Sequence, residues 1–199
     1  MLLAFDTSSA ACTVALFDGG GACIGHSDEL IGRGHSERLV PMIAELLDGR
    51  KADQVLVGVG PGSFTGIRVA IAAAHGLAIG WGSELGGMSS LALLAASADG
   101  EVAAAIVGGH GELFVQQFEA AQPTSELRNL VPADAASVTT ARLVIGSGAA
   151  QLVEARGWGE ARDAWPSASN ALRLSPALRS LPAKPVYARA PDARVKEAA

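Results

Sequence analysis

Residues Val55–Ile79, which read VLVGVGPGSFTGIRVAIAAAHGLAI, decide the fold of this chain. The apolar, β-branched run Val55–Val59 has the length of a buried strand. Gly60–Gly66 interrupts this run with glycines and a proline. Ile67–Ile79 then contains no proline and much alanine, which favours a helix. A strand, a glycine-rich turn and a helix in this order predict an α/β protein.

The glycine-rich turn Gly60–Gly66 has two interpretations. A turn between a strand and a helix can direct backbone N–H groups at an anion. This turn, however, is not G-x-G-x-x-G, and it lacks the lysine of a P-loop. The alternative is a tight connection in which glycines allow positive φ and close packing. The sequence leaves both interpretations open.

The helix predicted over Ile67–Ile79 is apolar nearly all round, because Arg68 and His75 are its polar side chains. A surface helix normally shows one apolar and one charged face. We therefore expect both sides to be covered, one by the core and the other by a second layer or a second chain. The run is too short and too rich in alanine and glycine for a membrane span of roughly 20 apolar residues. A central helix buried within one domain is the open alternative.

Composition limits the functional classes. The chain has 199 residues and a formal charge of −5, with no cluster of Lys or Arg. A protein that binds nucleic acid on its own usually has a basic face, so we expect any contact with RNA to be indirect. Cys12 and Cys23 form no C-x-x-C pair, and no two histidines stand four residues apart, so neither a metal site nor a cofactor is expected. Without a leader or a membrane segment, the expected location is the cytoplasm.

The order of predicted elements repeats along the chain. Three strands, a helix, a strand and a helix occur in residues 1–100, and the same order recurs more weakly in 101–199. We predict an N-terminal lobe and a smaller C-terminal lobe with an irregular tail, at these boundaries. A meander joined to parallel βα units is typical of ribonuclease H-like lobes, and two of them give the actin-like ATPase (ASKHA) architecture, in which nucleotide occupies the cleft.

Several local predictions accompany this reading. Ser36 is expected to cap the helix that ends at Leu47, and Pro41 inside it should delay its start or bend it. Gly86-Gly87 is followed by Ser89 and Ser90, either of which could cap a short helix over Leu91–Ala98. Ala168–Leu178 is a further candidate helix.

One polar group invites a catalytic interpretation. Asp6 ends the first predicted strand and is followed by Thr7 and Ser8. In an actin-like cleft this position would face Mg²⁺ and phosphate, but phosphoryl or glycosyl chemistry normally needs a second acid or base, and no comparable carboxylate stands out. A turn or capping role for these three residues is at least as well supported. A serine-peptidase reading lacks the G-x-S-x-G elbow.

Three strings carry a resemblance to a known family: LLAFDTSSAACTVAL at the start, GHSERLVPMIAELL after it, and GPGSFTGIRVAIAAAHGLA. They resemble the TsaB (YeaZ) family, the non-catalytic partner of the enzyme that makes threonylcarbamoyladenosine in tRNA. The likeness is strong over residues 1–97 and fainter beyond. It departs in the second lobe, where Val107-Gly108-Gly109-His110 replaces the acidic, arginine-containing turn that the family often has.

This resemblance implies a scaffold without a catalytic site, cofactor or metal. It implies dimers, pairing with a TsaD-like catalytic subunit, a TsaE-like ATPase in the assembly, and tRNA bound only indirectly. Pairing in the family uses the two helices after the first meander, here about Ser36–Leu47 and Ile67–Ile79. The predicted interface residues are His35, Arg38, Leu39, Met42, Arg68, Ile71, Ala72 and His75.

Two other functions stay open at this point. One is an ATP-binding or ATP-hydrolysing enzyme of the actin-like fold that uses Asp6, Thr7, Ser8 and the turn at Gly146. The other is a glycoprotease-like peptidase, which the residues support least.

Overall fold

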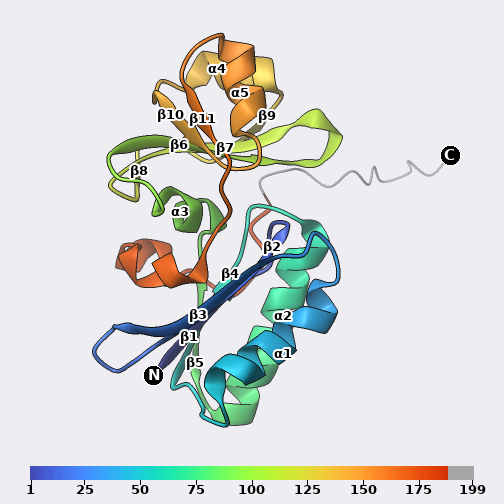
Figure 1. The fold of residues 1–199 in the computed structure, drawn as a ribbon, viewed down its shortest axis with the longest axis vertical. Coiled ribbons are helices and arrows are strands. Elements are labelled where there is room, and N and C mark those ends of the chain that lie inside the picture. The colour runs from blue at the N-terminus through green and yellow to red at the C-terminus, as the bar shows by residue number, and fades with distance from the viewer. Residues whose placement is uncertain (188–199) are drawn as a thin grey trace, which may run out of the picture.

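The computed structural model describes residues 1–187, which form two sheets with helices packed on their faces (Figure 1). The first sheet has the strand order β3-β2-β1-β4-β5. Its strands are β1 (Leu2–Asp6), β2 (Ala11–Phe17), β3 (Cys23–Leu30), β4 (Gln54–Gly58) and β5 (Glu84–Met88). β1 pairs antiparallel with β2 and parallel with β4. The meander predicted at the start of the chain therefore continues into parallel βα units.

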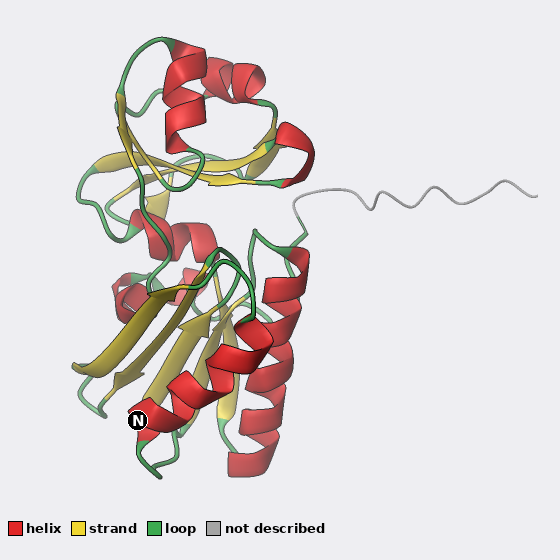
Figure 2. Cartoon of the chain, turned by 45° about the vertical axis from the view of Figure 1, so that its right-hand side comes forward, coloured by secondary structure: helices red, strands yellow, loops and turns green. Residues whose placement is uncertain are grey.

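Two helices, α1 (His35–Leu47) and α2 (Phe64–Trp81), lie side by side on one face of this sheet (Figure 2). Ser63 caps α2, because its side chain accepts a hydrogen bond from the Gly66 N–H. The helix therefore begins at Phe64 rather than at the predicted Ile67. Its 18 residues are, by length and composition alone, enough to cross a membrane, which corrects the expectation that it is too short. In this fold its buried side packs on the sheet through residues such as Ala70 and Ala74.

α1 begins directly after Gly34, which adopts the left-handed conformation that glycine tolerates. Pro41 lies inside the helix on its exposed side and does not delay its start, one of the two predicted effects; the other, a bend at Pro41, stays a prediction. The predicted cap is also wrong: the Ser36 hydroxyl donates to Glu37 and makes no capping hydrogen bond.

The second sheet repeats the strand order of the first. In β6 (Glu101–Val107), β7 (Leu113–Glu119), β10 (Leu143–Ile145) and β11 (Glu160–Arg162), the pairing reproduces that of β1, β2, β4 and β5. The shorter β8 (Gln122–Pro123) and β9 (Arg128–Leu130) both pair with β7. The helices α4 (Pro132–Val138) and α5 (Ala149–Arg156) cover the outer face. The predicted α/β class with a repeated lobe is confirmed.

The short helix α3 (Ser90–Ala95) joins the two lobes. All six of its residues are buried, and its leucines belong to one apolar cluster with residues of β1, β2, β6 and β7. Helices α1 and α2 pack over a separate cluster on the opposite face of the first sheet. The lobes therefore share a continuous core through α3.

After β11 the chain returns to the first lobe. The predicted helix over Ala168–Leu178 is instead two short 3-10 helices, η2 (Ala168–Arg173) and η3 (Pro176–Leu178). A third, η1 (Gly109–Gly111), lies in the second lobe. Leu181 bridges to Gly87 of β5, a strand that the sequence did not predict. The division at residue 100 stays a prediction, and the end of the predicted tail, 188–199, lies outside the described residues.

Candidate functional site

Asp6 is fully buried at the end of β1, and both of its carboxylate oxygens accept hydrogen bonds from the protein. Its Oδ1 accepts from the Ser8 N–H and the Ser8 hydroxyl, each at 2.7 Å. Its Oδ2 accepts from the Ser90 hydroxyl at 2.5 Å, and Ser90 Oγ in turn accepts from the Gly60 N–H at 3.1 Å. Asp6 therefore ties together β1, the turn after β4 and the start of α3.

The glycine-rich turn Gly60–Gly66 is hydrogen-bonded to Thr7 and Ser8, the two residues that follow Asp6. The Thr7 hydroxyl donates to the Gly66 carbonyl oxygen at 2.7 Å, and the Ser63 N–H donates to the Ser8 carbonyl oxygen at 2.6 Å. A Cβ on Gly66 would lie 1.9 Å from the Thr7 carbonyl oxygen, so a side chain there would collide with backbone. The close-packing interpretation of this turn is the one that its contacts support.

The same contacts show where the three candidate nucleotide-binding residues lie. The side chains of Asp6, Thr7 and Ser8 are brought together, but they are buried and engaged by the protein. The turn at Gly146, grouped with them by the ATPase reading, lies in the second lobe. Its Gly148 N–H donates to the Ala105 carbonyl oxygen at 3.0 Å.

The residues predicted as a partner interface divide into two groups. Ala72, His75 and Arg68 are exposed on α2, and His35 and Arg38 are partly exposed on α1. By contrast, the side chains that face the sheet are buried in the core below the helices. These are Leu39, Met42 and Ile71. In this chain these three offer almost no exposed surface to a partner, because apolar periodicity marks the buried face of a helix in its own fold.

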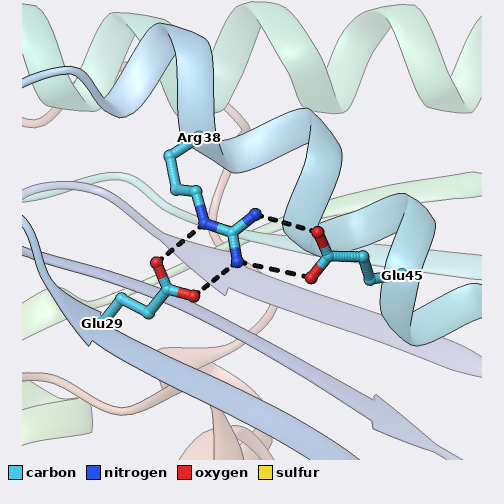
Figure 3. Close-up of polar contacts among 3 residues, drawn as sticks. All are labelled: Glu29, Arg38 and Glu45. Atoms are coloured by element: carbon cyan, nitrogen blue, oxygen red, sulfur yellow. Dashed lines mark hydrogen bonds and ion pairs between the residues drawn. The ribbon is translucent and has the colours of Figure 1, made fainter.

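Arg38 is held by two carboxylates of its own chain (Figure 3). Its guanidinium donates hydrogen bonds to both carboxylate oxygens of Glu29 on β3, at 2.7 and 2.5 Å. It also donates to the carboxylate of Glu45, seven residues further along α1, at 3.0 Å. The hydrogen bond from Arg38 holds the pKa of the Glu29 carboxyl below its usual value, and the two carboxylates raise the pKa of Arg38. Arg38 thus fastens α1 to the edge of the sheet and has its donors committed before any partner arrives.

The outer side of the two helices carries apolar residues that the sequence reading did not single out. Val40 is 55% exposed on α1, and Ile79 is 83% exposed on α2. Ala72 shares the outer stripe of α2 with Ile79, since the two are two helical turns apart. We call these three residues, Val40, Ala72 and Ile79, the helix-pair face. The sequence alone does not identify this face, because it does not say which side of each helix is buried against the sheet.

A cleft of about 1060 Å³ lies between the lobes. Its walls come from the segments 8–10, 32–36 and 62–69 of the first lobe and 106–109 of the second, with Trp165 and Tyr187 from the returning chain. The described residues that line it include Arg33, His35 and Arg68 but no Asp or Glu. Within residues 1–187, no group of three or more His, Cys, Asp or Glu side chains is placed to hold a metal ion.

Both cysteines fit a structural interpretation. Burial raises the pKa of the Cys12 thiol to about 11, and the nearby Glu29 carboxylate adds to this. Cys12 is therefore a protonated core side chain, whereas Cys23 is exposed near a hairpin turn.

Comparison with known proteins identifies the family. Residues 25–153, more than half of the chain, match the family described as "TsaD: tRNA N6-adenosine threonylcarbamoyltransferase". A Pseudomonas aeruginosa protein described as having "similarity to peptidase YEAZ" superposes with a TM-score of 0.80 and 32% identity, covering 94% of this chain and 99% of that one. The chain belongs to the TsaB (YeaZ) family.

Curated TsaB proteins agree with this assignment. The Haemophilus influenzae protein named "tRNA threonylcarbamoyladenosine biosynthesis protein TsaB" is 42% identical over 102 residues, 49% of this chain and 42% of that protein. The Escherichia coli protein of the same name is 36% identical over 128 residues, 59% of this chain and 54% of that protein. The match thus spans about half the length of these TsaB relatives.

A more distant structural neighbour bears on the fold alone. The ethanolamine utilization protein EutJ of Carboxydothermus hydrogenoformans superposes with a TM-score of 0.50 at 14% identity over 86% of this chain and 88% of that one. Together with the YeaZ structures it places the two repeated lobes of this TsaB-family chain among the actin-like ATPase-type folds, as predicted.

Proposed function

We propose that this chain acts in the biosynthesis of threonylcarbamoyladenosine in tRNA as a non-catalytic subunit. In this proposal it binds a TsaD-like enzyme and supports transfer of the threonylcarbamoyl group to adenosine. The observation that carries the proposal is membership of the TsaB family, whose curated members are named for this pathway. The burial of Asp6 supports the non-catalytic part, because that side chain has no exposed surface and both of its oxygens already accept hydrogen bonds from the protein.

The surface we assign to the partner is the helix-pair face. Exposed Val40, Ala72 and Ile79 lie on the two helices that cover one side of the first sheet, and they carry no charge. An exposed apolar surface on a small protein is typical of an interaction site. Small residues such as Ala72 and Gly76 let a second helix approach closely. The same face would join two copies when the chain is alone.

Further members of the assembly belong to the same proposal. A TsaE-like ATPase would join the pair, and tRNA would be held mainly by the partners, since the chain is acidic overall. Its place of action would be the cytoplasm, which cell fractionation would test.

The decisive experiment is light scattering of the chain alone and mixed with its TsaD-like partner. We expect a homodimer that yields to a heterodimer. A Glu side chain at position 72 would bury an unpaired charge at the contact, which costs several kcal/mol, so Ala72→Glu should abolish the heterodimer. Because Ala72 is exposed, the variant should keep its fold and its melting temperature.

Ala150→Glu is the matched control, since Ala150 is an exposed alanine on α5 of the other lobe. It should leave the heterodimer intact. A wild-type chain that ignores the TsaD-like partner would refute the proposed function. A heterodimer that survives Ala72→Glu would refute the surface and leave the function standing.

A further inference from the structure

The mouth of the inter-lobe cleft carries an exposed cluster of two aromatic rings and an arginine. Phe64 and Tyr187 are 64% and 51% exposed, and their ring centroids lie 5.9 Å apart. The Arg68 guanidinium carbon lies 3.2 Å from the Phe64 ring centroid and 5.2 Å from that of Tyr187. We call Phe64, Arg68 and Tyr187 the aromatic rim.

The aromatic rim is assembled from segments far apart in the sequence. Phe64 and Arg68 begin α2, whereas Tyr187 follows the chain that returns from the second lobe. The return is anchored, because the Val186 N–H donates to the Val59 carbonyl oxygen at 2.8 Å. Large aromatic side chains held in place at the surface lose little conformational freedom on binding. Tyr and Arg are also among the residues that dominate binding energy at interfaces.

The charge of the cleft is opposite to that of the whole chain. The chain has 20 acidic and 15 basic residues, but the described lining of the cleft includes two arginines and no carboxylate. Among residues 1–187, neither Arg33 nor Arg68 forms an ion pair. Arg68 donates one hydrogen bond to the Phe64 carbonyl oxygen and has further donors to offer. This distribution favours an anionic occupant.

The rest of the lining favours a peptide. Val69, Ile106, Phe114 and Trp165 give the cleft an apolar interior beneath the cationic mouth. The Phe64 ring cannot receive a flat base on the face that Arg68 covers, which disfavours a nucleotide stacked there. An apolar side chain in the interior with a carboxylate at the mouth satisfies both parts of the lining.

We propose that this cleft is a second docking point, which binds an acidic segment of a partner protein. An apolar side chain of that segment enters between the lobes, and a neighbouring carboxylate pairs with Arg68 and Arg33. The site is distinct from the helix-pair face, and the proposal does not depend on the pairing proposed there.

The test is an NMR titration of the full ¹⁵N-labelled chain with three short blocked peptides. The probes are Asp-Glu-Phe-Asp-Glu, the same peptide with alanine in place of phenylalanine, and Lys-Lys-Phe-Lys-Lys. We expect the first to shift signals of the cleft, including the Trp165 indole, and to weaken as salt screens the charges. The second should bind more weakly, and the basic peptide should not bind.

Arg68→Ala should weaken the acidic peptide about tenfold, as for loss of a hydrogen bond to a charged group. Arg33→Ala, in an exposed loop, serves as a second variant should Arg68→Ala fail to fold. Arg128→Ala, an exposed arginine of the second lobe, is the matched control and should change nothing. Ile79→Glu, on the helix-pair face and about three helical turns along α2 from Arg68, should also leave peptide binding unchanged, which separates this site from the helix-pair face.

Three results would overturn the proposal. The first is equal binding of the acidic and basic peptides, and the second is a set of shifted signals outside the cleft. The third is AMP binding at the cleft with no shift from the acidic peptide, which would make it a small-molecule site.

Discussion

Replacing Asp6 by asparagine separates a structural role of this carboxylate from a ligand-binding one. The carboxylate is fully buried and accepts three hydrogen bonds, two from Ser8 and one from Ser90. Asparagine keeps the shape but replaces one accepting oxygen by an NH₂ group, which can only donate. With the amide oxygen facing Ser8, the Ser90 hydroxyl loses its acceptor, and its own oxygen already accepts from Gly60.

The expected cost follows from that one lost bond. A hydrogen bond to a charged group contributes about 1.5–3 kcal/mol, and a buried donor left without a partner costs a similar amount. For a domain of this size, about 1 kcal/mol lowers the melting temperature by roughly 2–4 °C. We therefore expect Asp6→Asn to lower it by about 3–12 °C. Asp6→Ala, which removes all three hydrogen bonds, should lower the melting temperature further.

The assay is thermal unfolding followed by circular dichroism, with Asp99→Asn as control. The Asp99 side chain is fully exposed and makes one surface ion pair, so its loss should cost at most about 1 kcal/mol. A melting temperature unchanged by Asp6→Asn would refute the structural role. The carboxylate would then be free to serve a ligand, and calorimetry of the wild type with Mg-ATP would show heat that the variant lacks.

Three further predictions address other parts of the molecule. The Arg38–Glu29 ion pair should contribute to the free energy of unfolding above pH 4.5, the usual pKa of the Glu29 carboxyl. Because the pKa is lowered in the folded state, this contribution should be lost as the pH falls from 4.5 through the folded-state pKa. The difference in melting temperature between wild type and Glu29→Gln should therefore shrink in acid. Leu39→Ala should cost about 2–5 kcal/mol in denaturant unfolding, whereas Val40→Ala next to it should cost far less. A thiol reagent should label Cys23 rapidly and Cys12 only on unfolding, as mass spectrometry would show.

The sequence predicted elements well where local signals were strong. Strand Val55–Val59 and the helix after it appear within a few residues of their predicted bounds, because a short β-branched run and a long alanine-rich run each favour one structure. Ser89 caps α3 as its position suggested. The repeat of the two lobes was also visible, since it rests on the order of elements.

Long-range contacts explain what the sequence could not predict. Strand β5 was not predicted, because Gly86 and Gly87 give it no β-branched pattern; a Cβ on Gly87 would come within 2.7 Å of the Pro182 carbonyl oxygen. The partner of Asp6 is Ser90, 84 residues away, and no local pattern joins them. The same limit applies to Leu39, since a periodic apolar stripe does not say whether it faces its own sheet or another chain.

The duplicated architecture gives a reason to assign anion recognition in the cleft to side chains. Each lobe has a glycine turn after its second parallel strand, and each turn uses backbone N–H groups for internal closure. Ser63 donates to Ser8 in the first lobe, and Gly148 donates to Ala105 in the second. These two N–H groups are therefore not available to a phosphate. Asp6 is buried and does not line the cleft, so the arginines at the cleft are Arg33 and Arg68, and the proposed acidic segment would be recognised through them.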